Sequence, residues 1–134
     1  MNDPKIKELL RAATQRFESS EILFNNQAYQ DSVYLAGYVI ECAMKALILA
    51  QVPRNRRKDF EEKHFRGSHA HSAEYLWDLL VSRGMKPPLR MTVHLRRTDW
   101  SIDLRYKAGR GDRTTADAFL KSAKAVLMWV EESL

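Results

Sequence analysis

The sequence contains few of the residues that interrupt helices or cross-link a chain. Among its 134 residues are five glycines, four prolines and a single cysteine, Cys42. One cysteine excludes an intramolecular disulfide, and Cys42 stands in an apolar helical stretch, where a thiol usually behaves as a small core residue. No segment of useful length alternates apolar and polar residues as a half-buried strand does, and repeats are absent. These absences predict an all-α protein.

The signals that direct a protein into a membrane are also missing. The N-terminal stretch MNDPKIKELL has no apolar signal-peptide core. The longest apolar stretch, from about Val33 to Val52, contains Glu41, Lys45 and tyrosines, which disfavours a membrane span. We therefore expect a cytoplasmic protein with no membrane partner.

The composition is that of a globular protein, with 45% hydrophobic and 29% charged residues. The length fits one domain over residues 1–134 and is enough to bury a core without disulfides or metals. The net charge of +5 makes polyanions plausible partners, although net charge indicates non-specific association and not a site.

Apolar residues at helical spacing predict two long helices in the first part of the chain. The first is expected from about Pro4 to Asn25, with Asp3 as its N-cap and Pro4 at its first position. The second, from about Tyr29 to Gln51, is apolar on nearly every side, which is typical of a helix buried among several neighbours. Its polar residues project as one narrow seam, which comprises Asp31, Tyr34, Tyr38, Glu41 and Lys45.

The rest of the chain predicts shorter elements and a final long helix. We expect a loop over residues 54–71, a helix from Ser72 to Arg83 with Ser72 as its cap, and a short helix from Leu89 to Arg97. An ordered loop should follow from Thr98 to Arg113. The last helix is expected to begin at Thr114, in a capping box with Asp117. The expected fold is an antiparallel up-and-down bundle of four to five helices.

Four short motifs stand in a fixed order along these expected helices. They are Arg16-Phe17 with Ser20 and Leu23; Tyr34, Gly37-Tyr38, Glu41 and Lys45-Ala46-Leu47; His71 with Leu76 and Leu79-Leu80; and Leu104-Arg105-Tyr106. In this order and spacing they resemble the HEPN domain family over most of the chain. The resemblance implies a helical bundle, and it implies a homodimer because family members often work as dimers.

The resemblance narrows the function without selecting one. Some family members are metal-independent ribonucleases, including toxins, whereas others pair with minimal nucleotidyltransferases or are thought to bind nucleotides. The resemblance therefore implies that this chain binds a nucleotide, an RNA, a nucleotidyltransferase or a toxin–antitoxin partner. No cofactor is expected.

The catalytic motif of the family's ribonucleases is absent where it is expected. That motif is an arginine followed, after four to six residues, by a histidine near the start of the final helix, but no histidine follows Arg105. A histidine can move the proton of a 2′-hydroxyl, and an arginine can stabilise charge on a phosphate. Arg66 and His71 have the right spacing but precede the third helix, so they are candidates for an alternative ribonuclease only.

A metal site is a further possibility, because three histidines are close in sequence: His64, His69 and His71. A third ligand for a His-x-His pair and a supporting second shell are not evident, and structural zinc sites usually recruit cysteines. We expect no metal site.

The remaining polar candidates indicate a ligand or phosphate site. Glu41 and Lys45 are four apart, in the favoured orientation for an ion pair, and a buried Glu41 could also accept from Arg105. Basic residues form two clusters that could frame a phosphate-binding cleft, particularly across a dimer: Arg54, Arg56, Arg57 and Lys58; and Arg96, Arg97, Arg105, Lys107, Arg110 and Arg113. Trp100 and Tyr106 offer surfaces on which a base could stack. The candidate site comprises Glu41, Lys45, Arg105, Tyr106, Tyr38 and Arg110.

The sequence therefore favours a non-catalytic HEPN-like accessory domain that binds a nucleotide, RNA or a protein partner. One alternative is a metal-independent ribonuclease. The other is a purely structural dimerisation module, in which Trp100 and Trp129 would lie at the interface because the bundle does not need them.

Overall fold

The computed structural model describes residues 3–95 and 100–134, and within these ranges it contains helices and no strand. The α-helices are α1 (Pro4–Asn25), α2 (Tyr29–Ala50), α3 (Arg57–His64), α4 (Ala73–Ser82), α5 (Leu89–Leu95) and α6 (Arg113–Ser133). Three 3-10 turns lie between them: η1 (Arg54–Arg56), η2 (Ser68–His71) and η3 (Ile102–Tyr106). The all-α prediction is confirmed.

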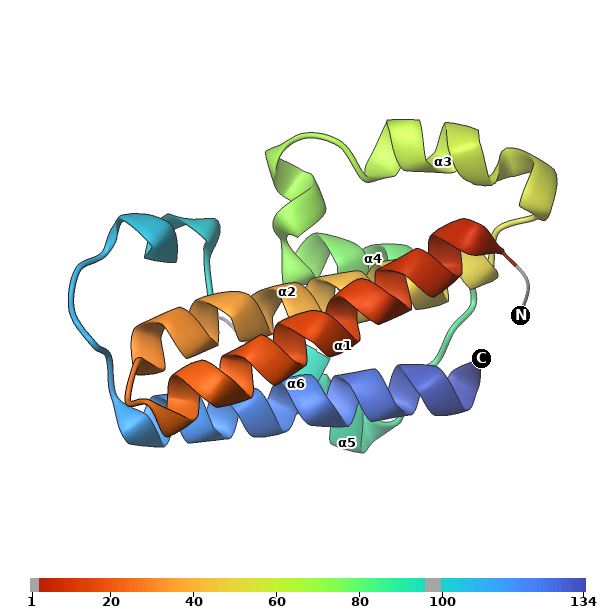
Figure 1. Cartoon of the computed structure of the whole chain (residues 1–134). Coiled ribbons are helices and arrows are strands. Elements are labelled where there is room, and N and C mark those ends of the chain that lie inside the picture. Colours follow the sequence, from red (N-terminus) through yellow and green to blue (C-terminus); the bar gives the residue numbers. More distant parts are fainter. Residues whose placement is uncertain (1–2, 96–99) are drawn as a thin grey trace.

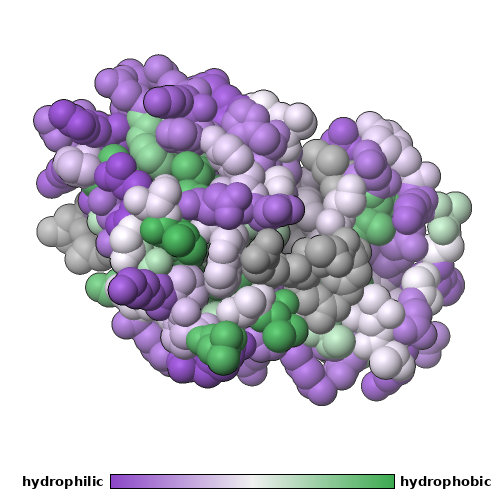
Figure 2. Space-filling view, turned by 180° about the vertical axis from the view of Figure 1, so that it is seen from behind, coloured by the Kyte–Doolittle hydropathy of each residue, from purple (hydrophilic) through white to green (hydrophobic). Residues whose placement is uncertain are grey.

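Three long helices lie side by side and form the body of the molecule (Figure 1). The α1 and α2 helices form an antiparallel hairpin, and α6 runs along both of them. The α4 helix packs on α2, α5 packs on α6, and η3 packs on α2 close to its start. Hydrophilic residues cover most of the opposite face, where hydrophobic residues form small separate patches (Figure 2).

The first helix begins where the sequence predicts. The carboxylate of Asp3 accepts hydrogen bonds from the backbone N–H groups of Lys5 and Ile6, which a helix cannot satisfy internally. The same carboxylate accepts from Arg57 at 2.7 Å. Asp3 therefore caps α1 and also joins it to the start of α3.

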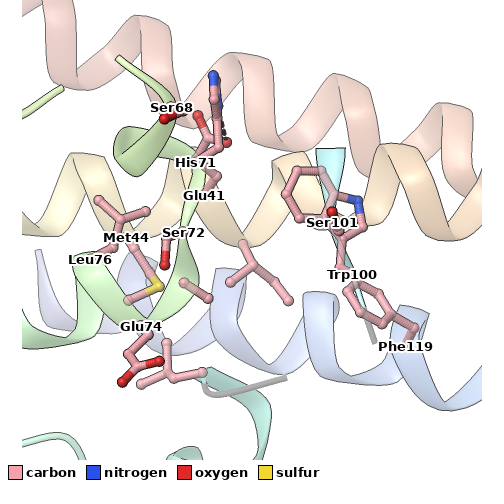
Figure 3. Close-up of a pocket in the computed structure, with 14 residues that line it drawn as sticks. Glu41, Met44, Ser68, His71, Ser72, Glu74, Leu76, Trp100, Ser101 and Phe119 are labelled. Atoms are coloured by element: carbon pink, nitrogen blue, oxygen red, sulfur yellow. Dashed lines mark hydrogen bonds and ion pairs between the residues drawn. The ribbon is translucent and has the colours of Figure 1, made fainter. Parts of the chain in front are cut away.

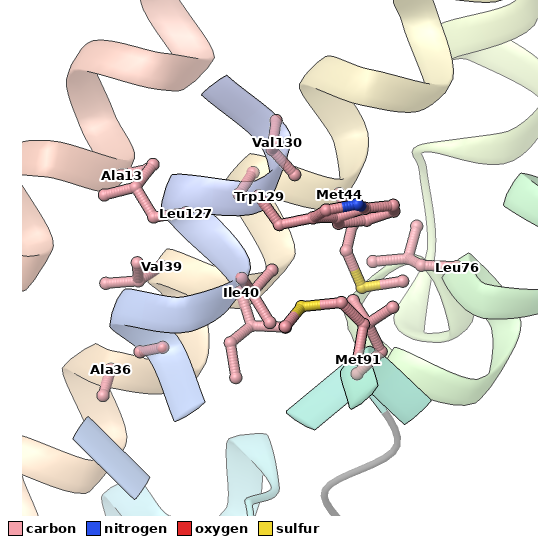
Figure 4. Packing of buried hydrophobic residues seen from close by; sticks show 14 of the residues in the cluster. Ala13, Ala36, Val39, Ile40, Met44, Leu76, Met91, Leu127, Trp129 and Val130 are labelled. Atoms are coloured by element: carbon pink, nitrogen blue, oxygen red, sulfur yellow. The ribbon is translucent and has the colours of Figure 1, made fainter. Parts of the chain in front are cut away.

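The α2 helix is the centre of the core, as its apolar pattern predicts. Ala36, Val39, Ile40 and Met44 of this helix pack against side chains from α4, α5 and α6 (Figure 4). By length and composition α2 could also cross a membrane, but 72% of its most apolar window is buried inside the molecule, as in a core helix. The expectation that Trp129 is surplus to the bundle is wrong, because its indole is only 7% exposed within this core.

The expected loop over residues 54–71 is largely helical, since η1, α3 and η2 all lie within it. No residue of α3 is fully buried, so the apolar periodicity that normally reveals a helix is weak there. The rings of Phe60 and Phe65 pack edge to face and cover the core from this side. Packing of these two rings, together with the Asp3–Arg57 ion pair, holds α3 in place.

The sequence predicts the N-cap of α4 correctly and the N-cap of α6 incorrectly. Ser72 caps α4 as expected, since its hydroxyl accepts from the backbone N–H of Tyr75. The cap of α6 is Asp112 and not Thr114, because the Asp112 carboxylate bonds both the backbone N–H and the hydroxyl of Thr115. Asp117, expected to complete a capping box, instead pairs with Lys121. Residues 98 and 99 of the expected loop, and the expected end of the short helix at Arg97, lie outside the described residues.

Candidate functional site

A cavity of about 390 Å³ opens beside the middle of α2, between η2, α4, α6 and residues 100–101, which directly precede η3 (Figure 3). Its floor is apolar and includes Ile40, Met44, Leu76, Leu95 and Phe119. Its polar lining comprises Glu41, Ser68, His71, Ser72, Glu74 and Ser101, and Trp100 forms one wall. We call this cavity the α2 pocket.

A buried carboxylate with two partners lies at the edge of the α2 pocket. Oε2 of Glu41 accepts from Nζ of Lys45 at 2.7 Å, and Oε1 lies 2.9 Å from Nδ1 of His71. Glu41 and Lys45 are each 8% exposed, so their charges need this pairing. The expectation that Glu41 accepts from Arg105 is wrong, because its two oxygens bond Lys45 and His71 instead.

Lys45 and His71 face the carboxylate from different sides. The ammonium of Lys45 lies 5.3 Å from the centroid of the Phe65 ring, a cation–π distance that further compensates the buried charge. His71 is the last residue of η2, and its side chain is 35% exposed. The hydrogen bond to Glu41 therefore holds η2 against α2 and leaves the imidazole at the pocket mouth.

The wall of the pocket depends on a close contact between Trp100 and Gly37. A Cβ atom added to Gly37 would overlap the indole of Trp100, so only glycine leaves room for the ring. The indole N–H donates to the backbone carbonyl of Tyr34 at 2.8 Å. The ring also stacks on Tyr34 and meets Tyr38 edge to face, with centroid distances of 6.2 and 5.2 Å. Trp100 is thus held as a fixed aromatic wall.

Tyr38 links this aromatic wall to His71. Its hydroxyl lies 3.0 Å from the hydroxyl of Tyr34, and its ring meets the imidazole of His71 edge to face. Burial, followed by the hydrogen bond with Tyr34, raises the pKa of Tyr38 far above its ordinary value, so this phenol stays protonated.

The predicted phosphate-binding residues lie on the η3 side of the pocket. The guanidinium of Arg105 lies 4.9 Å from the centroid of the Tyr106 ring, and that ring is 75% exposed. The pKa of Arg105 is raised chiefly by Tyr106 and to a smaller extent by Tyr34. The exposed guanidinium thus neighbours Tyr34, which in turn stacks on Trp100, although Arg105 itself is not part of the pocket lining.

The loop that follows η3 is anchored to α2. The backbone and side-chain nitrogens of Gln30 donate to the carbonyls of Arg110 and Lys107, each at 2.7 Å. Gly111 has a φ of +79°, and a Cβ atom there would press on the backbone of Gln30. The loop backbone is therefore fixed, while the side chains of Lys107 and Arg110 are exposed.

The two basic clusters do not frame one cleft within this chain. Arg54 and its neighbours follow the C-terminal end of α2, whereas Lys107 and Arg110 lie at its N-terminal end. A helix of 22 residues separates the two groups by roughly 30 Å. Arg57 also bonds Asp3 and a backbone carbonyl, so its role is structural. Arg96 and Arg97 lie outside the described residues.

The three neighbouring histidines have different partners. Nδ1 of His64 lies 2.7 Å from the hydroxyl of Tyr75, and burial lowers the pKa of this imidazole. The ring of His69 packs edge to face on Tyr75, whereas His71 turns to Glu41. Within residues 3–95 and 100–134, no group of three His, Cys, Asp or Glu side chains could hold a metal ion. Arg66 is exposed and is not part of the pocket lining.

The sequence predicts part of this pocket. Glu41 and His71 line it and are both sequence candidates, as are Tyr38 and Lys45, which contact them from outside the lining. The sequence also offers Trp100 as a stacking surface, but it does not predict the close contact of Trp100 with Gly37. A signal for it exists, because glycine within a helix costs about 1 kcal/mol relative to alanine and often marks a close approach. Of the lining serines, Ser72 signals only a helix cap, and Ser68 and Ser101 stand outside any periodic pattern.

The comparisons with known proteins give one match. A protein-family model described as HEPN domain matches residues 6–133 of the chain. No curated protein and no solved structure matches it.

Proposed function

The chain belongs to the HEPN domain family, and we propose that it is a non-catalytic accessory domain that binds a nucleotide unit in the α2 pocket. The nucleotide is either free or exposed on single-stranded RNA, since the chemistry to be recognised is the same. Membership of the family supports a general HEPN-type role, which is often related to nucleotides or RNA.

The observation that carries this proposal is the composition of the α2 pocket. Its volume of about 390 Å³ falls in the range of small-molecule sites. Unstacked bases are recognised by stacking on aromatic side chains and by hydrogen bonds to their edges. The pocket offers an aromatic wall in Trp100, an apolar floor, and polar groups such as His71 at its rim.

The cationic side chains beside the pocket support the same ligand. Arg105 is exposed and neighbours Tyr34, whose ring stacks on Trp100, and Lys107 follows it on the anchored loop. A guanidinium can grip a phosphate with two parallel hydrogen bonds, and the net charge of +5 favours the approach of a polyanion.

Direct binding measurements test the proposal. Calorimetry with nucleoside monophosphates and fluorescence anisotropy with single-stranded RNA should give saturable binding that weakens as salt rises. Arg105→Ala should weaken it by about tenfold, whereas Arg54→Ala, which removes the same charge at the other end of α2, should change it little. Absence of binding to every monophosphate and to RNA at low salt would refute the proposal.

One observation favours a second candidate, a metal-independent ribonuclease. Because Nδ1 of His71 can donate to Glu41, Nε2 is left as an acceptor at the pocket mouth, which is the arrangement of a general base. The arginine of the candidate pair, Arg66, is not in the pocket lining. RNA cleavage in EDTA that is lost in His71→Ala would establish this activity and displace the non-catalytic role.

Dimerisation and pairing with a nucleotidyltransferase are proposals that come from the family. The α5 helix exposes Leu89 and Val93, which are 87% and 70% exposed, and such residues often lie at interfaces. Light scattering of the purified chain would measure its oligomeric state. A monomer at all concentrations would contradict the dimer.

A further inference from the structure

The lining of the α2 pocket offers no cationic partner for a phosphate among the described residues. No lysine or arginine of the described residues lines the pocket. The carboxylate of Glu41 is already paired with Lys45 and His71 at the pocket edge. A phosphate inside this partly enclosed space would lose hydration without gaining an ion pair from these lining residues. A negatively charged group is therefore disfavoured within the pocket.

The shape and polarity of the interior suit a flat, uncharged ring. The floor is made by side chains such as Met44, Leu76 and Phe119, and the indole of Trp100 stands across the cavity from the floor around Met44 (Figure 3). A heterocycle that enters between them would bury both of its faces against apolar groups. The favourable free energy would come from burial and stacking and not from ion pairing.

Two serine hydroxyls of the lining are oriented as hydrogen-bond donors. Oγ of Ser72 accepts from the backbone N–H of Tyr75, and Oγ of Ser101 accepts from the backbone N–H of Asp103. Each hydroxyl retains its own hydrogen, which it can donate to a ligand. Ring nitrogens and carbonyl oxygens at the edge of a base are suitable acceptors.

On the basis of the proposed function, we infer that the α2 pocket holds the base of the nucleotide and that the phosphate stays outside, against Arg105. The base stacks on Trp100 and accepts from the hydroxyls of Ser72 and Ser101. Gly37 acts as a positioning residue, since it provides the space in which Trp100 lies. Recognition thus divides between a pocket interior with an apolar floor and a cationic exterior.

Calorimetric titrations with four nucleosides, their monophosphates and inorganic phosphate test this division. At least one nucleoside should bind within about tenfold of its monophosphate, because one charged contact contributes about that factor. Inorganic phosphate should not displace a bound nucleoside. Arg105→Ala should weaken the monophosphate to the level of the nucleoside and leave the nucleoside unchanged, while Arg54→Ala should alter neither.

Trp100→Ala should weaken the nucleoside and the monophosphate alike, by about tenfold or more. Circular dichroism would show whether this variant is folded, and the phosphate competition requires no variant at all. For RNA, the matched comparison is an oligonucleotide and its abasic counterpart, of which only the first should bind.

The failures of the two proposals are distinguishable. If monophosphates bind, nucleosides do not, and inorganic phosphate competes, then the phosphate occupies the pocket and this inference is wrong, although the proposed function stands. If neither monophosphates nor RNA bind, the proposed function itself fails.

Discussion

Nδ1 of His71 lies 2.9 Å from Oε1 of Glu41, a residue 30 positions earlier in the chain. The other oxygen of Glu41 bonds Lys45 at 2.7 Å. One buried carboxylate therefore neutralises a buried ammonium and also holds η2 against α2. Both the stability of the bundle and the shape of the pocket mouth depend on it.

Glu41→Gln should lower the free energy of unfolding by about 3 kcal/mol, because it leaves the buried charge of Lys45 without its carboxylate. Urea denaturation measures this change.

The control variants are Lys45→Met and the double variant that combines Glu41→Gln with Lys45→Met. The double variant should be less destabilised than the sum of the two single changes, since it removes both charges together. Strict additivity would show that the two side chains do not compensate each other.

Gly37→Ala should destabilise the protein by about 1–3 kcal/mol, because the new methyl group displaces the Trp100 indole. In a Trp100→Ala background the same change should instead stabilise it by about 1 kcal/mol, since alanine favours a helix more than glycine does. Urea titrations of the four proteins measure this reversal of sign. An equal effect in both backgrounds would contradict the contact.

The ion pair between Asp3 and Arg57 should make stability depend on pH in acid. The hydrogen bond from Arg57 is the main cause that lowers the pKa of Asp3 below its ordinary value of 3.8. The folded protein then binds fewer protons, so this stabilisation is complete above the ordinary pKa and is lost as pH falls through the lowered one. Asp3→Asn should cost no more than about 1 kcal/mol near neutral pH, after allowance for solvent screening, and nothing in strong acid.

Urea denaturation of wild type and Asp3→Asn, from neutral pH down to strong acid, tests whether the stability difference between them shrinks as the pH falls. Asp59→Asn, a change at an exposed position of α3, serves as the control. A stability difference for Asp3→Asn that grows as the pH falls would contradict the assignment.

The long elements of the fold could be predicted because their signals are local. The α1 helix begins at a capping aspartate followed by proline, and α2 is apolar on nearly all sides, so both were predicted nearly to the residue. The sequence of α3 predicts a loop instead of a helix, because none of its residues is fully buried and its apolar periodicity is therefore weak. The cap of α6 was misplaced by two residues, since both Asp112 and Thr114 are good capping residues and only the geometry selects one.

The candidate site was harder to predict because its members meet through tertiary contacts. Helical spacing revealed Glu41 and Lys45, but the choice between Arg105 and His71 as a further partner depends on where η2 and η3 pack. The wall of Trp100 on Gly37 joins residues far apart in the chain, and no local pattern specifies such a pair.

The most direct test of the central claim is an NMR titration of the protein, labelled with nitrogen-15 in its three tryptophans, with nucleoside monophosphates. The indole N–H signal of Trp100, assigned with Trp100→Phe, should move in a saturable way, because that indole forms the wall of the α2 pocket. The signals of Trp77 and Trp129 should stay in place, since neither residue lines the pocket. A Trp100 signal that does not move at saturating ligand would contradict nucleotide binding in the α2 pocket.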